Sequence, residues 1–141
     1  VTTQDDPSEP SGVNIDTGHA LMAFENLADS MALCHRFGKL FYLHWNDNYR
    51  DWDHDMIVGS VNLWETLEAL YWLNRLGYDG WHSLDIYPYR QNALEAATES
   101  IRNLKRLMNI ARSLDEQKMT SFRESNDVTG IIRYLREMTI K

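Results

Sequence analysis

Short apolar runs of strand length alternate with stretches of helical periodicity along most of the chain, and this alternation limits the folds that the sequence can adopt. The strand-like runs cover 13–16, 40–44 and 81–86. Strands that alternate with helices usually pair in parallel, because each helix carries the chain back across the sheet before the next strand begins. The sequence therefore predicts an α/β fold with a parallel sheet, which is either open or part of a closed barrel.

The helical stretches follow the strands after connections of the short length that βα units use. They cover 25–37, 62–77, 91–113 and, with a break near 126–130, the remainder of the chain to 141. Gly38 and Gly77 stand where the first two helices should end, as glycine often does at a helix C-terminus. Asn62 followed by Glu65 is typical of a capping box, so we expect the Asn62 side chain to cap the second helix.

The composition fits one domain, or a piece of a larger one, and argues against two classes of partner. Hydrophobic residues make up 43% of the 141 residues, which is enough to build a core. The formal net charge of -7 argues against the phosphate attraction on which nucleic-acid binders depend. No apolar run reaches the roughly 18 residues that a membrane-spanning helix needs. We therefore expect a protein that binds neither nucleic acid nor membrane.

The start of the chain and its cysteine content indicate where such a protein would work. Residues 1–12 are polar and hold two of the three prolines, so we expect a flexible lead-in without the apolar segment of a signal peptide. The first residue is valine and not methionine, which is expected of a trimmed chain or of a piece of a longer protein. Cys34 is the single cysteine, so a reducing cytoplasm is the expected compartment.

Residues that can bind metal ions stand at or near the end of each predicted strand. These are Asp16, His44 and Asp85. Parallel strands bring their C-terminal ends to one side of the sheet, where the active sites of α/β proteins form. His19 follows Asp16 after a predicted tight turn at Gly18, which can aim both side chains into one pocket. The sequence therefore predicts that donors distant in the chain converge at one rim.

An acidic loop follows the second strand and adds further oxygen donors at 51–55. Carboxylates mixed with imidazoles suit manganese, cobalt or magnesium better than the thiolate-rich sites of structural zinc. Each residue also has an ordinary alternative role: an aspartate at a strand end often caps a helix, a lone histidine often packs, and an acidic loop is often merely solvated. The coincidence of donors on three successive strands is what favours a cation site.

Four segments in a fixed order carry a resemblance to a known family. They are Gly12-Val13-Asn14-Ile15-Asp16-Thr17-Gly18-His19-Ala20, Leu43-His44-Trp45-Asn46-Asp47, Asp53-His54-Asp55 with Gly59-Ser60 behind it, and Leu84-Asp85-Ile86-Tyr87-Pro88-Tyr89-Arg90. Together they resemble the xylose-isomerase-like barrel superfamily, and among its members the bacterial L-rhamnose isomerase type. The resemblance covers roughly residues 12–102.

The resemblance implies a fold and a set of metal ligands. The implied fold is the C-terminal part of a (β/α)8 TIM barrel, with about three βα units over 13–113, followed by a C-terminal helical extension over 114–141. The implied ligands of a structural cation, which also contacts substrate hydroxyls, are Asp16, His44 and Asp85. Those of a second, catalytic cation are His19, Asp53 and Asp55.

The resemblance also implies an activity, which is the interconversion of aldoses and ketoses on the open-chain sugar. Two divalent ions (Mn, Co or Mg) would polarise the oxygens on the first two carbons while a hydrogen moves between those carbons as hydride. The bridging glutamate that the family carries on an earlier strand is not found in this sequence. We therefore expect an incomplete active site, and either a homo-oligomer or pairing with a missing N-terminal half-barrel.

The sequence leaves open two alternatives to an isomerase of the L-rhamnose isomerase type. Other members of the same superfamily, such as keto-sugar epimerases, hydroxypyruvate isomerases and endonuclease IV-like hydrolases, share the Asp-x-x-His pattern. The pair Asp53 and Asp55 favours the isomerase type, and the acidic net charge disfavours a DNA-repair enzyme. The second alternative is a non-catalytic remnant that assembles with another chain, since the edges of a small parallel sheet need cover.

Two groups of aromatic residues have different predicted roles. Trp64, Tyr71 and Trp72 recur at helical spacing and are expected to pack against the sheet. Trp45 and Trp52 fall in predicted loops at the side of the metal ligands. There they either line a sugar pocket or anchor the loop.

Overall fold

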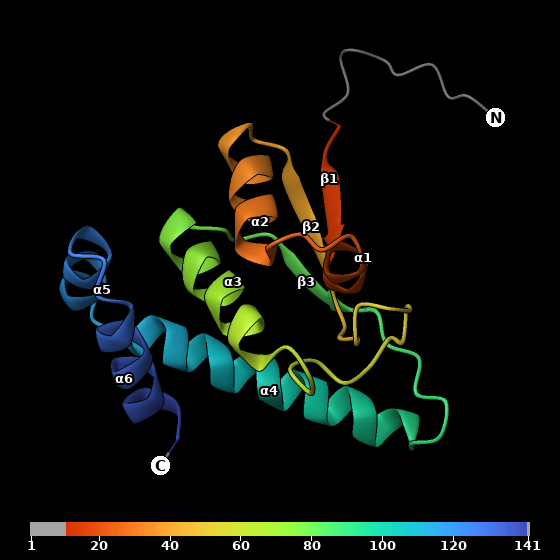
Figure 1. The fold of residues 1–141 in the computed structure, drawn as a ribbon. Coiled ribbons are helices and arrows are strands. Elements are labelled where there is room, and N and C mark those ends of the chain that lie inside the picture. Colours follow the sequence, from red (N-terminus) through yellow and green to blue (C-terminus); the bar gives the residue numbers. More distant parts are fainter. Residues whose placement is uncertain (1–10, 141) are drawn as a thin grey trace.

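The computed structural model of the protein describes residues 11–140, which form a three-stranded parallel sheet and six helices (Figure 1). The strands lie side by side in chain order, as β1 (Val13–Asp16), β2 (Leu40–Trp45) and β3 (Trp81–Leu84). The helices are α1 (Thr17–Met22), α2 (Leu27–Arg36), α3 (Leu63–Leu76), α4 (Ala93–Ser113), α5 (Glu116–Glu124) and α6 (Val128–Thr139). Of the predicted lead-in over 1–12, residues 1–10 lie outside the described part.

The register of the strands sorts their residues onto two faces. Asp16 pairs with His44 and His44 with Ser83, so these three share one face of the sheet. Ile15 pairs with Leu43, which pairs with His82, and these share the other face. Asp16 and His44 therefore lie in register, and Asp85 follows directly after the end of β3.

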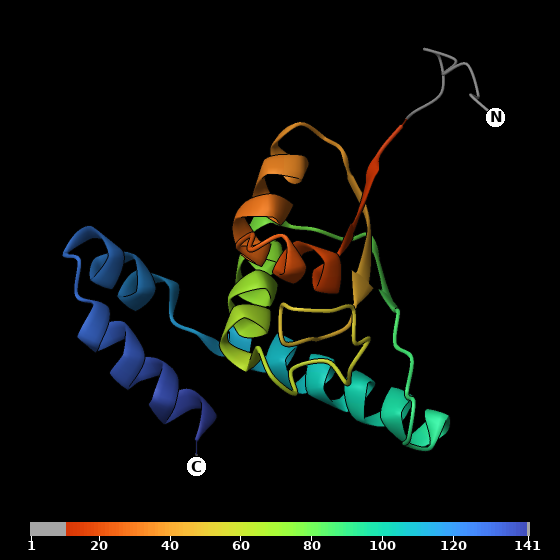
Figure 2. The same ribbon diagram turned by 45° about the vertical axis from the view of Figure 1, so that its right-hand side comes forward.

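Helices α2 and α3 cover one face of the sheet, and the core lies between them and the strands (Figures 1 and 2). Leu43 and Trp45 of β2 are completely buried there, and Ile15 of β1 is nearly so. Helix α4 packs along α3 and contributes Leu104 and Leu107 to the same core. Burial of such side chains from water is the main favourable contribution to folding.

The opposite face of the sheet is not covered by any described element (Figure 2). Asn14 and Trp81 of that face are exposed, with 76% of the Trp81 surface accessible to solvent. Tyr42, which lies between them in the register, is partly exposed. Parallel sheets in compact proteins are normally covered on both faces, so this one-sided packing is unusual.

The predicted TIM-barrel part is wrong. The three strands form a small open sheet, in which β1 and β3 are edge strands among the described residues. The chain between β1 and β2 forms two helices, α1 and α2, and does not follow a simple repeat of three βα units. Strand and helix periodicity indicates the order of the elements, but closure depends on strand number and stagger, which periodicity does not determine. The coarser prediction of an α/β fold is confirmed, while the predicted boundary at residue 114 stays a prediction.

The helices agree with the predicted stretches, except at the start of the chain. Gly77 ends α3 with a left-handed φ of 69°, as predicted. A break separates α5 from α6, where Asn126 has a φ of 54°. The predicted tight turn at Gly18 is instead the start of the short helix α1, whose N-cap is Asp16.

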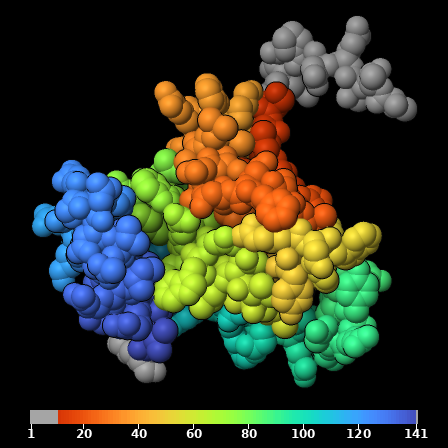
Figure 3. Space-filling view, viewed as in Figure 1, coloured from red at the N-terminus to blue at the C-terminus, as the bar shows by residue number. Residues whose placement is uncertain are grey.

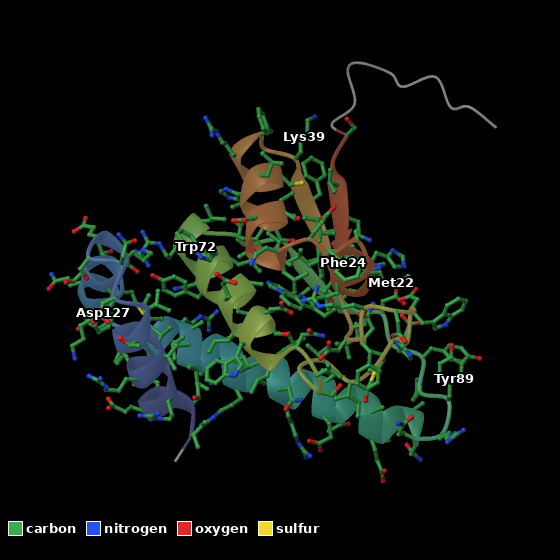
Figure 4. All side chains as sticks on the ribbon, in the orientation of Figure 1. Met22, Phe24, Lys39, Trp72, Tyr89 and Asp127 are labelled. Atoms are coloured by element: carbon green, nitrogen blue, oxygen red, sulfur yellow. The ribbon has the colours of Figure 1, made fainter. Side chains whose placement is uncertain are left out.

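Helices α5 and α6 lie beside α3, on the side away from the strands (Figure 1). Figure 4 shows Trp72 on α3 near α5, and Asp127 at the connection between α5 and α6. The Arg123 guanidinium of α5 lies 5.5 Å from the centre of the Trp72 ring, which fastens α5 to α3. None of the helices in the described residues is long and apolar enough to cross a membrane.

Candidate metal centre

Asp16, His44 and Asp85 meet at the C-terminal ends of the three strands. One ligand atom of each lies within 4.8 Å of those of the other two. The His44 Nδ1 atom lies 3.0 Å from an oxygen of Asp85 and 3.7 Å from an oxygen of Asp16. The structure therefore brings together the three residues that the sequence predicted to share one site.

The local structure fixes each member of this group. Asp16 is both the last residue of β1 and the N-cap of α1, where its Oδ1 accepts the His19 backbone N–H at 3.0 Å. The Asn46 side-chain amide donates to both Asp16 oxygens, at 3.1 and 3.3 Å. The Asp85 backbone N–H donates to the Trp45 carbonyl, so the position after β3 is tied to β2. Asp16 is thus a helix cap as well as a predicted ligand, and the two roles do not exclude each other.

His19 and Asp53 form a second pair beside the first group. The His19 Nε2 atom lies 2.9 Å from an Asp53 oxygen, although 34 residues separate them in the chain. The hydrogen bond to Asp53 raises the pKa of His19, and the nearby negative charge of Asp16 and Asp55 adds to the increase. The carboxylates around His19 thus favour the positive charge of its protonated form.

Asp55 belongs to the same acidic surroundings. Burial raises the pKa of Asp55, and repulsion from Asp53, Asp85 and Asp16 raises it further. The other Asp53 oxygen, Oδ1, is buried and has no hydrogen-bond partner within the described residues. The acidic groups therefore repel one another here, and one buried carboxylate oxygen is left without a hydrogen bond.

The donor set fits divalent cations. Asp16, His44 and Asp85 offer two carboxylates and one imidazole, and His19, Asp53 and Asp55 offer the same combination beside them. Such sets suit manganese, cobalt or magnesium, and three protein ligands leave coordination positions for substrate oxygens. Among the described residues, only Asp16, His44 and Asp85 have ligand atoms within 4.8 Å of one another. His19 contacts Asp53, and Asp55 is near enough for its charge to interact with theirs. The role of all six as ligands stays a prediction.

Buried polar residues next to the ligands were not predicted to matter. Thr17 and Asn46 exchange hydrogen bonds, since the Thr17 hydroxyl donates to the Asn46 carbonyl and the Asn46 N–H donates to the hydroxyl oxygen. The Asn48 amide, which is completely buried, donates to the Gly18 carbonyl. The run Asn46-Asp47-Asn48 directly after a buried strand is the sequence signal that could have revealed this network.

The two loop tryptophans behave differently from each other. Trp45 is completely buried at the end of β2, where its indole N–H donates to His82 Nδ1 at 3.0 Å. It faces the helices, so the prediction that it stands in a loop at the ligand side is wrong. Trp52 lies in the loop after β2 and is 65% exposed, and it remains free to contact a ligand.

A cavity of about 480 Å³ opens beside Asp55. Its walls include Tyr49, His54 and the pair Tyr87 and Tyr89, whose rings lie 4.9 Å apart. Figure 4 shows Tyr89 at the edge of the molecule, in the segment between β3 and α4. Aromatic rings beside polar groups are typical of pockets that bind small polar molecules.

Comparisons with known proteins do not assign a family. No protein-family model matches the chain, and no curated protein matches it. Assignment of a function therefore depends on the geometry of the site and on the resemblance of its sequence segments.

Proposed function

We propose that this chain carries the cation-binding site of a divalent-metal-dependent aldose–ketose isomerase of the L-rhamnose isomerase type, working in the cytoplasm. The observation that carries the proposal is the convergence of Asp16, His44 and Asp85 at the strand ends. When bound, two cations would polarise the oxygens on the first two carbons of an open-chain sugar and stabilise developing negative charge.

The residues of the chain have distinct roles in this proposal. Asp16, His44 and Asp85 hold the first cation, and the amide of Asn46 keeps the Asp16 carboxylate in place. His19 and Asp53, which already lie 2.9 Å apart, hold the second cation together with Asp55. Since His19 must be unprotonated to bind a cation and Asp53 raises its pKa, binding at the second site should release protons.

The tyrosine-walled cavity supports a sugar as the ligand. It adjoins Asp55, so a molecule bound at the cations would extend along Tyr49 and Tyr87. Aromatic rings contact the C–H faces of sugars while polar groups meet their hydroxyls. Exposed Trp52 offers a further ring beside Asp53 in the chain.

Manganese titration together with a sugar isomerisation assay tests this function. The wild-type chain should bind Mn²⁺, and Asp16→Ala should lower the affinity of the first site about 100-fold, at the upper end of what loss of a supporting residue costs. Asp51→Ala is the matched control, because it removes the same charge from an exposed side chain in the neighbouring acidic loop. Equal affinity in wild type and Asp16→Ala would show that the assigned ligands are wrong. Conversion of an aldose to its ketose with Mn²⁺, lost in Asp16→Ala, would establish the activity.

A second candidate is a non-catalytic chain that assembles with another chain. The uncovered face of the sheet, with Trp81 76% exposed, favours it. Sedimentation of the purified chain across concentrations tests this candidate, since self-association should reduce the exposure of Trp81 and shift its fluorescence. A monomer at all concentrations that binds Mn²⁺ would favour the isomerase site over the assembly role.

A further inference from the structure

Asp47 is a completely buried carboxylate that no cation neutralises within the described residues. Only 1% of its surface is exposed, and no arginine, lysine or histidine nitrogen of the described part lies within ion-pair distance of it. Burial of a charge is costly unless hydrogen bonds replace the lost water. A group of this kind is retained where it fixes a particular arrangement of the chain.

Four donors surround the Asp47 carboxylate. Oδ1 accepts the Asn48 backbone N–H at 2.9 Å and the Asn62 side-chain amide at 2.6 Å. Oδ2 accepts the backbone N–H groups of Val61 and Asn62, at 2.8 and 3.0 Å. Each oxygen therefore has two donors, and the carboxylate joins the end of β2 to the start of α3.

The same residue also holds the middle of the loop. The Asp47 carbonyl accepts the Met56 N–H at 2.9 Å in an isolated antiparallel bridge. Residues 48–60 thus form a loop that is closed at its base by Asp47, and this loop carries Asp53 and Asp55. In Figure 3 the yellow atoms of the loop lie directly beside the orange-red atoms of the α1 region.

The backbone of this loop is strained where it approaches the site. Arg50 has a φ of 72° and Asp55 a φ of 47°, which non-glycine residues rarely adopt. Such conformations persist only where surrounding contacts enforce them. Arg50 is held by an ion pair with Glu65, and the Asp55 carbonyl accepts the Tyr87 N–H. Asp47 contacts the chain on both sides of the strained segment 50–55, through the N–H groups of Asn48 and Met56.

We propose that Asp47 is the positioning residue of the second cation site: its buried carboxylate clamps the base of loop 48–60 and thereby places Asp53 and Asp55 against His19. Asp47 touches none of these three side chains and acts only through the loop. This inference rests on the proposed two-cation function.

Asn62 supplies evidence that the network outweighs local preferences. Its position at the N-cap of α3 predicts that its side chain caps the helix, yet α3 has no side-chain cap hydrogen bond. The Asn62 amide instead donates to Asp47 and to the Asn48 carbonyl. The predicted capping box is therefore wrong. The hydrogen bonds from the Asn62 NH₂ group to Asp47 and Asn48 orient the side chain so that it does not cap α3.

Asp47→Asn tests the proposal, since it keeps the shape of the side chain but turns one acceptor into a donor. Whichever way the amide is oriented, its NH₂ group meets two N–H donors. Mn²⁺ titration should show about 10- to 100-fold weaker binding at the second site and unchanged binding at the first. The variant should thus behave like Asp53→Asn, which alters a ligand of the second site, and not like Asp16→Ala, which removes a ligand of the first site. Asp51→Ala again serves as the control for charge.

Hydrogen exchange on the cation-free protein supplies a readout that does not depend on metal. The amides of Met56, Val61 and Asn62 should exchange faster in Asp47→Asn, while those of β2 stay protected. If Asp47→Asn does not fold, Asn62→Ala is the variant to test, because it removes only one hydrogen-bond donor from Asp47 Oδ1. Weaker second-site binding in Asn62→Ala then supports the proposal.

Three outcomes would overturn the inference or its basis, and they are distinguishable. Wild-type binding of two cations with the same affinities in a folded Asp47→Asn overturns the role of Asp47 alone. Unchanged exchange at Met56 and Val61 in that variant shows that the loop does not depend on the clamp. Absence of any second cation in the wild type overturns the two-cation function itself, and the positioning role with it.

Discussion

The two faces of the sheet are built from alternate residues of the same strands, but they have opposite properties. The face toward α2 and α3 is closed and apolar, with Leu43 and Trp45 completely buried. The other face is open and ends in Asp16 and His44. A change of one position along a strand therefore moves a side chain from the core to the candidate site. This difference shows that the role of a residue here depends on the face it occupies more than on its chemical type.

Two histidines illustrate the comparison. His44 of β2 lies among carboxylates on the open face, with Nδ1 3.0 Å from Asp85. His82 of β3 lies on the helix side, where its ring stacks on Trp45 with 5.9 Å between ring centres and accepts the indole N–H. His44 is a proposed cation ligand, whereas His82 packs against a buried tryptophan.

Leu43→Ala should give the largest effect on stability. Leu43 has no exposed surface, so the truncation should leave a cavity and lower the free energy of unfolding by about 2–5 kcal/mol. Urea unfolding followed by tryptophan fluorescence measures it. Asn14→Ala on the open face is the control and should change stability by less than about 0.5 kcal/mol. Equal losses in the two variants would contradict the division into a closed and an open face.

His44→Ala should weaken binding at the first cation site while leaving most of the stability intact. We expect a loss of Mn²⁺ affinity of about 100-fold, which corresponds to about 2.7 kcal/mol. His82→Asn is the matched control, because its amide oxygen can still accept the Trp45 N–H. Weaker Mn²⁺ binding in His82→Asn than in His44→Ala would reverse the assignment of the two histidines.

Gly18→Ala should affect both the fold and the site. A Cβ atom at Gly18 would overlap Asn46 Oδ1, so Asn46 must move away from Asp16. Overpacking of this kind costs about 1–3 kcal/mol, and cation affinity at the first site should fall with it. Gly38→Ala strains a left-handed residue but meets no neighbouring atom, so it should lower stability without changing affinity. Unchanged Mn²⁺ binding in Gly18→Ala would show that Asn46 does not hold Asp16.

A small pH dependence should come from His82, which lies on the helix side of the sheet but is exposed at the edge strand β3. Partial burial lowers the pKa of His82 below its ordinary 6.5, and the Arg112 charge lowers it further. The unfolded state therefore binds the proton more readily, so stability should fall as the pH drops below about 6.5 and be complete above it. The free energy of unfolding of the cation-free protein is measured at about pH 7.5 and about pH 5.5. The change between the two pH values in His82→Asn is then subtracted from the change in the wild type. Identical pH dependence in His82→Asn would exclude His82 as its source.

Local patterns in the sequence predicted much of the secondary structure. The strand predicted over 13–16 coincides with β1, and the run 40–44 falls within β2. The donors at the strand ends could also be predicted, because parallel strands align their ends whatever the rest of the fold is. The barrel was predicted wrongly, since the number of strands that pair is a property of the whole sheet.

These local patterns could not predict side-chain directions and hydrogen-bond partners that depend on the tertiary structure. Trp45 sits next to His44 in the chain yet faces the helices, and Asn62 gives up its local cap to satisfy Asp47. A one-residue error in the end of β2 was enough to misplace Trp45, since alternate residues face opposite ways.

The sequence by itself predicted the three strands, the helices after α1 and the convergence of Asp16, His44 and Asp85, because these follow from periodicity and from parallel pairing. Only the tertiary structure decided that the sheet is open, and that a buried carboxylate at Asp47 fixes the loop bearing Asp53 and Asp55. The physical reason is the distance along the chain over which each kind of interaction acts. Periodicity is a property of neighbouring residues, whereas the satisfaction of a buried charge depends on donors that the fold alone brings together.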